Sequence, residues 1–194
     1  MARRKVYGSS PNMLEHYGDI VELNYQVDDS VFSDIAKITD WQQEKTRRYI
    51  DLIGNTDQDY RGKSEQDLEY NSNMQQMPEI KKLIDKFTGV SGNTVYKARV
   101  MELDAGSYFE PHRDHFQGGK RFRILIPLNN TTRDKYAFFY EDKIVEFKPR
   151  TPYILNTRKI HGAMCFADKT YHVLMSVNNT DENQRKVIDM ITFR

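Results

Sequence analysis

The chain has 194 residues, of which 38% are hydrophobic and 12% aromatic, and its formal net charge is +1. This length and composition suit one domain with a buried core and exclude a globally disordered chain. The near-zero charge makes no electrostatic case for a nucleic-acid partner or an anionic membrane. The single cysteine, Cys165, excludes an intramolecular disulfide and a multi-cysteine zinc site. Because no apolar run reaches membrane-spanning length and no signal peptide follows Met1, we expect a soluble cytoplasmic protein.

Helices and loops are predicted for residues 1–94. Ser30 can cap a helix over VFSDIAKI, and Asp40 can cap a second helix over WQQEKTRRYIDLI, which would end at Gly54. The polar residues 55–76 predict a long surface loop or a lid.

The clearest helical pattern is MPEIKKLIDKFTG. Its apolar residues follow the spacing i, i+3, i+4 and i+7, at Ile80, Leu83, Ile84 and Phe87. Gly89 stands where a C-terminal cap belongs. This pattern predicts an amphipathic helix that packs its apolar face on another layer.

After Gly92 the chain changes to short β-type runs separated by turn residues. The runs are TVYKARVMEL, RFRILIPLN, YAFFYE, KIVEFK, PYILNT, HGAMCFA and YHVLMSVN. Seven or eight short strands at this spacing indicate a β-sandwich or barrel, and helices that come first suit a jelly roll with helices on one outer face. We therefore predict a mainly β protein with N-terminal helices (α+β). Residues 1–94 would pack on a β core of residues 95–194 within one domain.

Histidines and one aspartate in the β-rich part indicate a metal site. His112 and Asp114 lie two residues apart, so on an extended backbone both side chains project to the same side. His161 lies in a later strand or at its start, and closing the sheet can bring it alongside. Two imidazoles and one carboxylate on one face are the ligand set of a non-haem Fe(II) oxygenase, which leaves adjacent coordination positions open. Because a His-x-Asp pair alone is common on protein surfaces, this hypothesis depends on His161 and on the β context.

Residues 99–180 resemble the double-stranded β-helix, a jelly-roll and cupin-like fold, of Fe(II)/2-oxoglutarate-dependent oxygenases. The similarity is to the aspartyl/asparaginyl β-hydroxylase-like and free-proline hydroxylase branches. It is carried by PHRDHFQGGKRFRILIPLN, AFFYEDKIVEFKPRTPYILNTRKIHGAM and YHVLMSVN. The resemblance implies that His112, Asp114 and His161 bind the iron and form the catalytic centre. The β-hydroxylases proper often lack the carboxylate, which Asp114 supplies here.

The strand RFRILIPL has two unlike faces. One face is wholly apolar, while the other carries Arg121 and Arg123 and faces either solvent or the cavity. By resemblance, Arg123 occupies the position of a co-substrate arginine of the family. This residue would neutralise the far carboxylate of 2-oxoglutarate, because an unpaired carboxylate is costly in a dry barrel.

The second basic residue of the family, an arginine on the last strand, is absent from this chain. Tyr171 and His172 stand at the corresponding position. Three interpretations remain open. His172 replaces the arginine while Ser176 or Tyr171 supplies a hydroxyl; Arg123 binds the anion alone; or the co-substrate is not 2-oxoglutarate.

The resemblance implies oxidative decarboxylation of 2-oxoglutarate to succinate and CO₂, coupled to hydroxylation of an unactivated C–H by O₂. The substrate would be a free amino acid or a side chain such as Asp, Asn or Pro in a peptide or protein. Two alternatives are kept. A cupin-like metal enzyme without 2-oxoglutarate would need the three ligands but not Arg123, and a non-catalytic jelly-roll binding module would need no metal.

Overall fold

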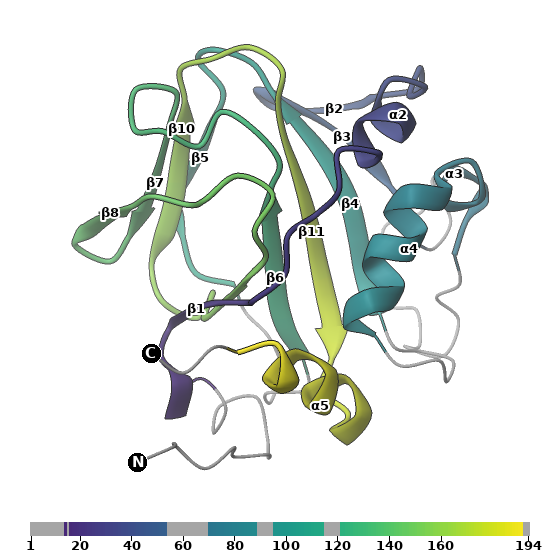
Figure 1. Ribbon diagram of the computed structural model, residues 1–194. Coiled ribbons are helices and arrows are strands. Elements are labelled where there is room, and N and C mark those ends of the chain that lie inside the picture. Colours follow the sequence, from purple (N-terminus) through teal and green to yellow (C-terminus); the bar gives the residue numbers. More distant parts are fainter. Residues whose placement is uncertain (1–13, 15, 54–69, 89–94, 115–120, 192–194) are drawn as a thin grey trace.

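Two antiparallel β-sheets form the body of the protein (Figure 1). The computed structural model describes residues 14, 16–53, 70–88, 95–114 and 121–191. The large sheet has the order β1-β9-β6-β11-β4-β3-β2 and the small sheet the order β5-β10-β7-β8. The strands of the large sheet are β1 (Ile20–Glu22), β2 (Gln42–Glu44), β3 (Arg47–Asp51), β4 (Val95–Leu103), β6 (Arg121–Pro127), β9 (Tyr153–Leu155) and β11 (Thr170–Asn178). Those of the small sheet are β5 (Tyr108–His112), β7 (Tyr136–Tyr140), β8 (Lys143–Val145) and β10 (His161–Cys165).

From β4 onward the chain passes repeatedly between the two sheets. Strands β4, β6, β9 and β11 belong to the large sheet, and β5, β7, β8 and β10 lie between them in sequence and belong to the small sheet. This alternation makes a double-stranded β-helix, so the prediction of a mainly β jelly roll with added helices is confirmed. The first three strands come from residues 1–94 and extend the large sheet at both edges. The division at residue 94 stays a prediction.

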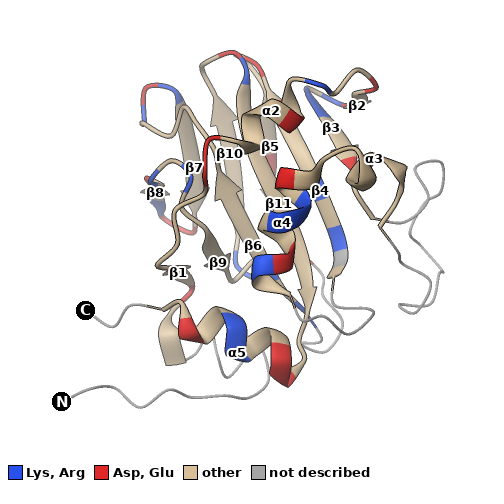
Figure 2. Cartoon of the chain, turned by 45° about the vertical axis from the view of Figure 1, so that its right-hand side comes forward, with Lys and Arg blue, Asp and Glu red and all other residues tan. Residues whose placement is uncertain are grey.

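The helices cover the outer face of the large sheet (Figure 1). They are α2 (Val31–Ile35), α3 (Ser72–Gln75), α4 (Pro78–Phe87) and α5 (Asp181–Asp189). The four apolar residues that predicted α4 are all buried and pack with outward-facing residues of β4, β6 and β11. Basic and acidic residues both occur on the exposed sides of α4 and α5 (Figure 2). No helix in the described ranges is long and apolar enough to cross a membrane.

The space between the sheets is apolar at one end and polar at the other. Along β4 the residues that point inward run from Lys97 and Arg99 to Met101 and Leu103. Strand β6, which lies on the other side of β11, shows the same change from Arg123 to Leu125. Aromatic residues of β7, together with Phe147 and Tyr153, fill the apolar end. The polar ends of the strands therefore line a pocket, which lies above an aromatic core.

The predicted helix over WQQEKTRRYIDLI is wrong, because this segment forms the hairpin β2–β3. Arg47, Tyr49 and Asp51 face the inside of the barrel, while Ile50 pairs with Val100 on the helix-covered side. The turn between the two strands contains no Gly or Asn, the residues that usually indicate a hairpin turn. Lys45 adopts the positive φ of 52° instead, a conformation that lysine seldom takes.

Two other differences concern helices and loops. Ser30 does precede α2, but its side chain makes no capping hydrogen bond. Helix α5 was not predicted, although Thr180 caps it by accepting a hydrogen bond from the Asn183 backbone N–H. The predicted loop 55–76 lies outside the described residues as far as residue 69, and its end contains α3.

Candidate metal centre and pocket

The two strands β5 and β10 bring three possible metal ligands together. His112 ends β5 and His161 begins β10, and the two residues are direct partners in the antiparallel register. Their ring centroids are 4.3 Å apart. Asp114 follows two residues after His112, and one ligand atom from each of the three residues lies within 4.8 Å of the others. The sequence prediction that these residues meet on one face is consistent with this geometry.

Both imidazole rings are oriented by the backbone two residues earlier in the chain. The Nδ1 of His112 lies 2.7 Å from the carbonyl oxygen of Glu110, and the Nδ1 of His161 lies 3.0 Å from that of Lys159. Because a carbonyl oxygen only accepts, Nδ1 is the donor in each ring, and in the neutral form of the ring Nε2 keeps its lone pair. Burial lowers the pKa of His161, which favours the neutral ring that a metal ion requires.

The two oxygens of Asp114 face different neighbours. Oδ1 lies 3.6 Å from Nε2 of His112, while Oδ2 accepts a 2.7 Å hydrogen bond from Nη2 of Arg123. Burial alone would raise the pKa of Asp114, but the charge and hydrogen bond of Arg123, a hydrogen bond from Thr157 and the charge of His161 together outweigh it, and the pKa is lowered. The Asp114 backbone N–H also donates to the carbonyl oxygen of Thr157, 2.8 Å away. Asp114 is therefore an oriented carboxylate.

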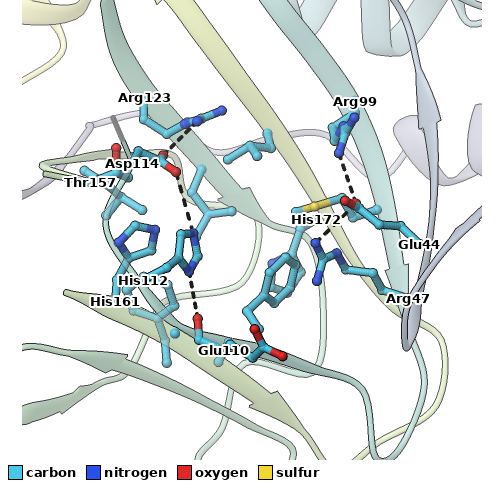
Figure 3. Close-up of a pocket in the computed structure, with 18 of the residues that line it drawn as sticks. Glu44, Arg47, Arg99, Glu110, His112, Asp114, Arg123, Thr157, His161 and His172 are labelled. Atoms are coloured by element: carbon cyan, nitrogen blue, oxygen red, sulfur yellow. Dashed lines mark hydrogen bonds and ion pairs between the residues drawn. The ribbon is translucent and has the colours of Figure 1, made fainter. Parts of the chain in front are cut away.

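These ligands stand on one side of a pocket of about 330 Å³ between the sheets. On the opposite side, Glu44 is shared by Arg47 at 3.2 Å and Arg99 at 3.5 Å (Figure 3). Arg99 is also bonded to both carboxylate oxygens of Asp51, at 3.0 and 3.2 Å. This charged wall comes from β2, β3 and β4, so the segment that was predicted as a helix supplies part of the pocket.

The residues predicted to bind the co-substrate are placed in two groups. Arg123 is buried beside Asp114, and its strand register places it opposite Ser176. His172 lies deeper, with its ring edge-on to Tyr136 at a centroid distance of 4.6 Å. Both of its ring nitrogens and the hydroxyl of Ser176 are buried, and no described residue gives them a hydrogen bond. Burial lowers the pKa of His172 to about 3, so this ring is neutral.

The lining residues that sequence reasoning did not identify include Lys97 and Tyr136, as well as the charged wall of Glu44, Arg47 and Arg99. A lysine in an amphipathic strand is ordinarily a solvent-facing residue, and YAFFYE was interpreted as core packing. The inward alternation of Lys97, Arg99 and Met101 was the available signal. His115 lies outside the described residues.

Comparison with known proteins gives one match to a protein family. The model of the aspartyl/asparaginyl beta-hydroxylase family matches residues 33–178. The matched region includes the hairpin β2–β3 and ends with the last residue of β11. No curated protein sequence matches the chain.

Several solved structures are similar in fold. A 2OG-Fe(II) oxygenase family oxidoreductase from Burkholderia pseudomallei has a TM-score of 0.59 and 10% identity, over 94% of this chain and 96% of that chain. A prolyl hydroxylase from Trichoplax adhaerens, in complex with a hypoxia inducible factor peptide fragment, has a TM-score of 0.52 and 15% identity, with 88% of each chain covered. The non-heme alpha ketoglutarate dependent epimerase SnoN has a TM-score of 0.51 and 11% identity, over 87% of this chain and 81% of that chain.

At these identities the solved structures support the fold, whereas the family match spans most of the chain in sequence. It covers the strands that carry the three ligands, the arginine strand β6 and the final strand β11. The chain therefore belongs to the aspartyl/asparaginyl β-hydroxylase family.

Proposed function

We propose that this protein is a non-haem Fe(II)- and 2-oxoglutarate-dependent dioxygenase that hydroxylates an unactivated C–H of an amino acid or of a peptidyl side chain. The observation that carries the proposal is the cluster of His112, Asp114 and His161, whose ligand atoms lie within 4.8 Å of one another. When bound there, iron(II) with 2-oxoglutarate and O₂ would supply the oxidising power for this chemistry.

The donor set fits the ion. Two neutral imidazoles present Nε2, and one ionised carboxylate presents Oδ1, so the set is 2-His-1-carboxylate. The backbone carbonyls behind both rings fix the tautomer, which is the usual outer-shell support of a metal-binding histidine. The position of His161, buried in the pocket, and of His112, at its rim, leaves access from one side.

We assign the co-substrate to Arg123, Ser176 and His172. Arg123 would orient Asp114 and place positive charge beside the keto-acid, while Ser176 and His172 offer buried polar atoms that have no described partner. The aromatic core fills the apolar end of the space between the sheets, which would limit the water that reaches the site. That limit keeps the oxidising equivalents for the substrate.

The substrate class rests on relatives and on pocket size. The family name refers to aspartyl and asparaginyl residues, and one structural relative is a prolyl hydroxylase that was solved with a peptide. A volume of about 330 Å³ is at the lower end for ligand pockets and suits a keto-acid together with one side chain. We therefore propose a free amino acid, a peptide or a protein as the partner, and we place the protein in the cytoplasm.

Succinate formation tests this proposal. Protein supplied with Fe(II), 2-oxoglutarate and O₂ is incubated with amino acids and short Asp-, Asn- and Pro-containing peptides, and succinate and a substrate mass gain of one oxygen are measured together. Both should appear in equal amounts with a true substrate and disappear in His112→Ala. Substrate oxidation without succinate would favour the cupin-like enzyme that does not use 2-oxoglutarate. Failure to bind Fe(II) at all would leave the non-catalytic binding module.

A further inference from the structure

Lys97 is a cation in the pocket without a partner. It lines the pocket from β4, and its ammonium makes no hydrogen bond or ion pair with any described residue. Burial, together with Arg99 and Arg123 nearby, lowers its pKa to about 8, against the opposing pull of Asp51 and Glu44. A half-buried ammonium close to two guanidiniums is unfavourable unless an anion enters the same space.

Ser176 lies between Lys97 and Arg123 in the large sheet, on the same face of the sheet as these two residues. In the sheet register Ser176 is the direct partner of Lys97 on β4 and of Arg123 on β6. Directly paired residues point to the same face, and adjacent strands lie about 4.8 Å apart. The Ser176 hydroxyl is buried and has no hydrogen-bond partner in the described structure. The row thus offers a hydroxyl donor between two cations.

Other basic groups of the pocket are either paired with carboxylates of the protein or uncharged. Arg123 is bonded to Asp114, and Arg99 is bonded to Asp51 and Glu44. His172 is neutral, so it can donate or accept a hydrogen bond but cannot neutralise a carboxylate. Among the described lining residues of the inner sheet face, Lys97 is the cation left for an incoming anion.

We propose that Lys97 and Ser176 bind the far carboxylate of the 2-oxo acid, and that Lys97 on β4 supplies the charge of the arginine that β11 lacks. The inference rests on the proposed function, because it concerns the co-substrate of that same site. A keto-acid held at the triad through its 1-carboxylate and keto oxygen would extend from the Asp114 side of β6 across β11 toward β4. Ser176 lies one strand along this line and Lys97 two strands along it.

The test compares two keto-acids that differ only at the far end. Protein loaded with Mn(II) under anaerobic conditions, which prevents turnover, is titrated calorimetrically with 2-oxoglutarate and with 2-oxopentanoate, in which a methyl group replaces the far carboxylate. Lys97→Met should weaken 2-oxoglutarate by roughly 10- to 100-fold and leave 2-oxopentanoate within about 3-fold. Lys97→Arg should restore most of the loss. Lys143→Met, on the exposed strand β8, is the matched control and should change neither value.

Other binding results would decide against the inference. Equal 2-oxoglutarate affinity in wild type and Lys97→Met overturns it while leaving the proposed function in place, as does an equal loss for both keto-acids. Unchanged 2-oxoglutarate binding combined with weaker binding of an acidic substrate would assign Lys97 to the substrate instead. If the Mn(II)-loaded wild type binds no 2-oxoglutarate, the proposed function itself fails and the inference falls with it. A rise or no change in melting temperature of Lys97→Met confirms that lost binding is not lost folding.

Discussion

Single residues of the pocket affect stability as well as binding, and Lys97 is the clearest case. Its pKa is lowered from 10.5 to about 8 by burial first and by Arg99 and Arg123 second, while Asp51 and Glu44 act in the opposite direction. Between these two pH values the unfolded chain binds the extra proton, so this group makes the folded protein more stable as pH rises from about 8 to about 10.5. At pH 7 the Lys97 ammonium is charged in both states, so its full unfavourable contribution to the stability of the folded protein is present.

Replacing this residue by an uncharged one should therefore stabilise the empty protein. We expect Lys97→Met to raise the free energy of unfolding at pH 7 by on the order of 1–3 kcal/mol. The gain should shrink toward zero near pH 10.5. Urea denaturation at pH 7 and pH 10 measures both values, with Lys143→Met as the control. A destabilised Lys97→Met at pH 7 would show that the ammonium has a favourable partner.

His112 offers a separate test at the residue scale, because its side chain is 44% exposed and its bonded neighbour is its own backbone segment. His112→Ala should weaken Mn(II) binding by about 100-fold or more and change the free energy of unfolding by less than about 1 kcal/mol. Electron paramagnetic resonance of free Mn(II) gives the affinity. The exposed His16 is the matched control, and His16→Ala should bind Mn(II) as the wild type does.

The three candidate metal ligands could be predicted from the sequence, whereas the ion pairs and pKa shifts of the pocket could not. His112 and Asp114 share a face because strand alternation is local, and the distal His161 completes a known ligand set. The bond between Arg123 and Asp114 depends on how β6 lies beside the segment after β5, which is a long-range relation. The pKa of Lys97 depends partly on charged residues of three other strands, β2, β3 and β6, and no local sequence pattern indicates this.

At the scale of elements, helix α4 takes its cap from another part of the chain. Met77 precedes the helix and has no capping side chain, whereas the buried Asp34 accepts hydrogen bonds from the backbone N–H groups of Glu79 at 2.7 Å and Ile80 at 3.0 Å. Asp34 lies within α2, so these hydrogen bonds also join the two helices.

Removing this cap should lower stability. We expect Asp34→Ala to reduce the free energy of unfolding by about 1–3 kcal/mol, because two helix N–H groups lose their acceptor. Asp34→Asn keeps one oxygen acceptor and should lose less. Urea denaturation ranks the three proteins, and equal stability of Asp34→Ala and wild type would contradict the capping role.

The contact between β5 and β10 leads to a prediction about metal geometry. A Cβ on Gly162 would lie 2.9 Å from the carbonyl oxygen of Phe109 and 3.2 Å from the nitrogen of Pro111, and backbone atoms cannot move aside alone. Gly162→Ala should therefore separate the strands that carry His112 and His161, and weaken Mn(II) binding by roughly 10-fold or more. Met164→Ala, on the exposed face of β10, is the control. Unchanged affinity in Gly162→Ala would mean that the strands tolerate the shift.

Elements with local signals were predicted well, and those stabilised by distant pairing were not. Helix α4 and the strands after residue 92 follow from apolar periodicity and turn residues. The hairpin β2–β3 has helix-compatible composition, and its strand form depends on pairing with β4, about fifty residues later in the chain. Pairing in the sheet overrides weak local propensity at such a segment.

At the scale of the whole molecule, ligand binding between the sheets should stabilise the entire fold. The three candidate ligands come from β5, the segment after it and β10, and residues of β4, β6 and β11 line the same pocket, so molecules bound there would contact both sheets. Mn(II) and 2-oxoglutarate, each at about 100 times its dissociation constant, together add about 5 kcal/mol and should raise the melting temperature by about 10–20 °C. Calorimetry measures the shift. A chelator should reverse it, and the same shift in His112→Ala would place the binding elsewhere.

The architecture as a whole was predicted from the order of helices and strands, together with the family resemblance. The boundary at residue 94 and the cytoplasmic location stay predictions. The helix-covered face of the large sheet follows from amphipathic α4, but the edge strands contributed by residues 1–94 have no sequence signal of their own, because three- to five-residue strands are too short to show alternation.

The different neighbours of the two Asp114 oxygens have a consequence for metal binding. Since Arg123 donates a hydrogen bond to Oδ2, Oδ1 is the oxygen that Asp114 would offer to an ion beside His112 and His161. An arginine outside the candidate ligand set would in this way select which carboxylate oxygen binds the ion.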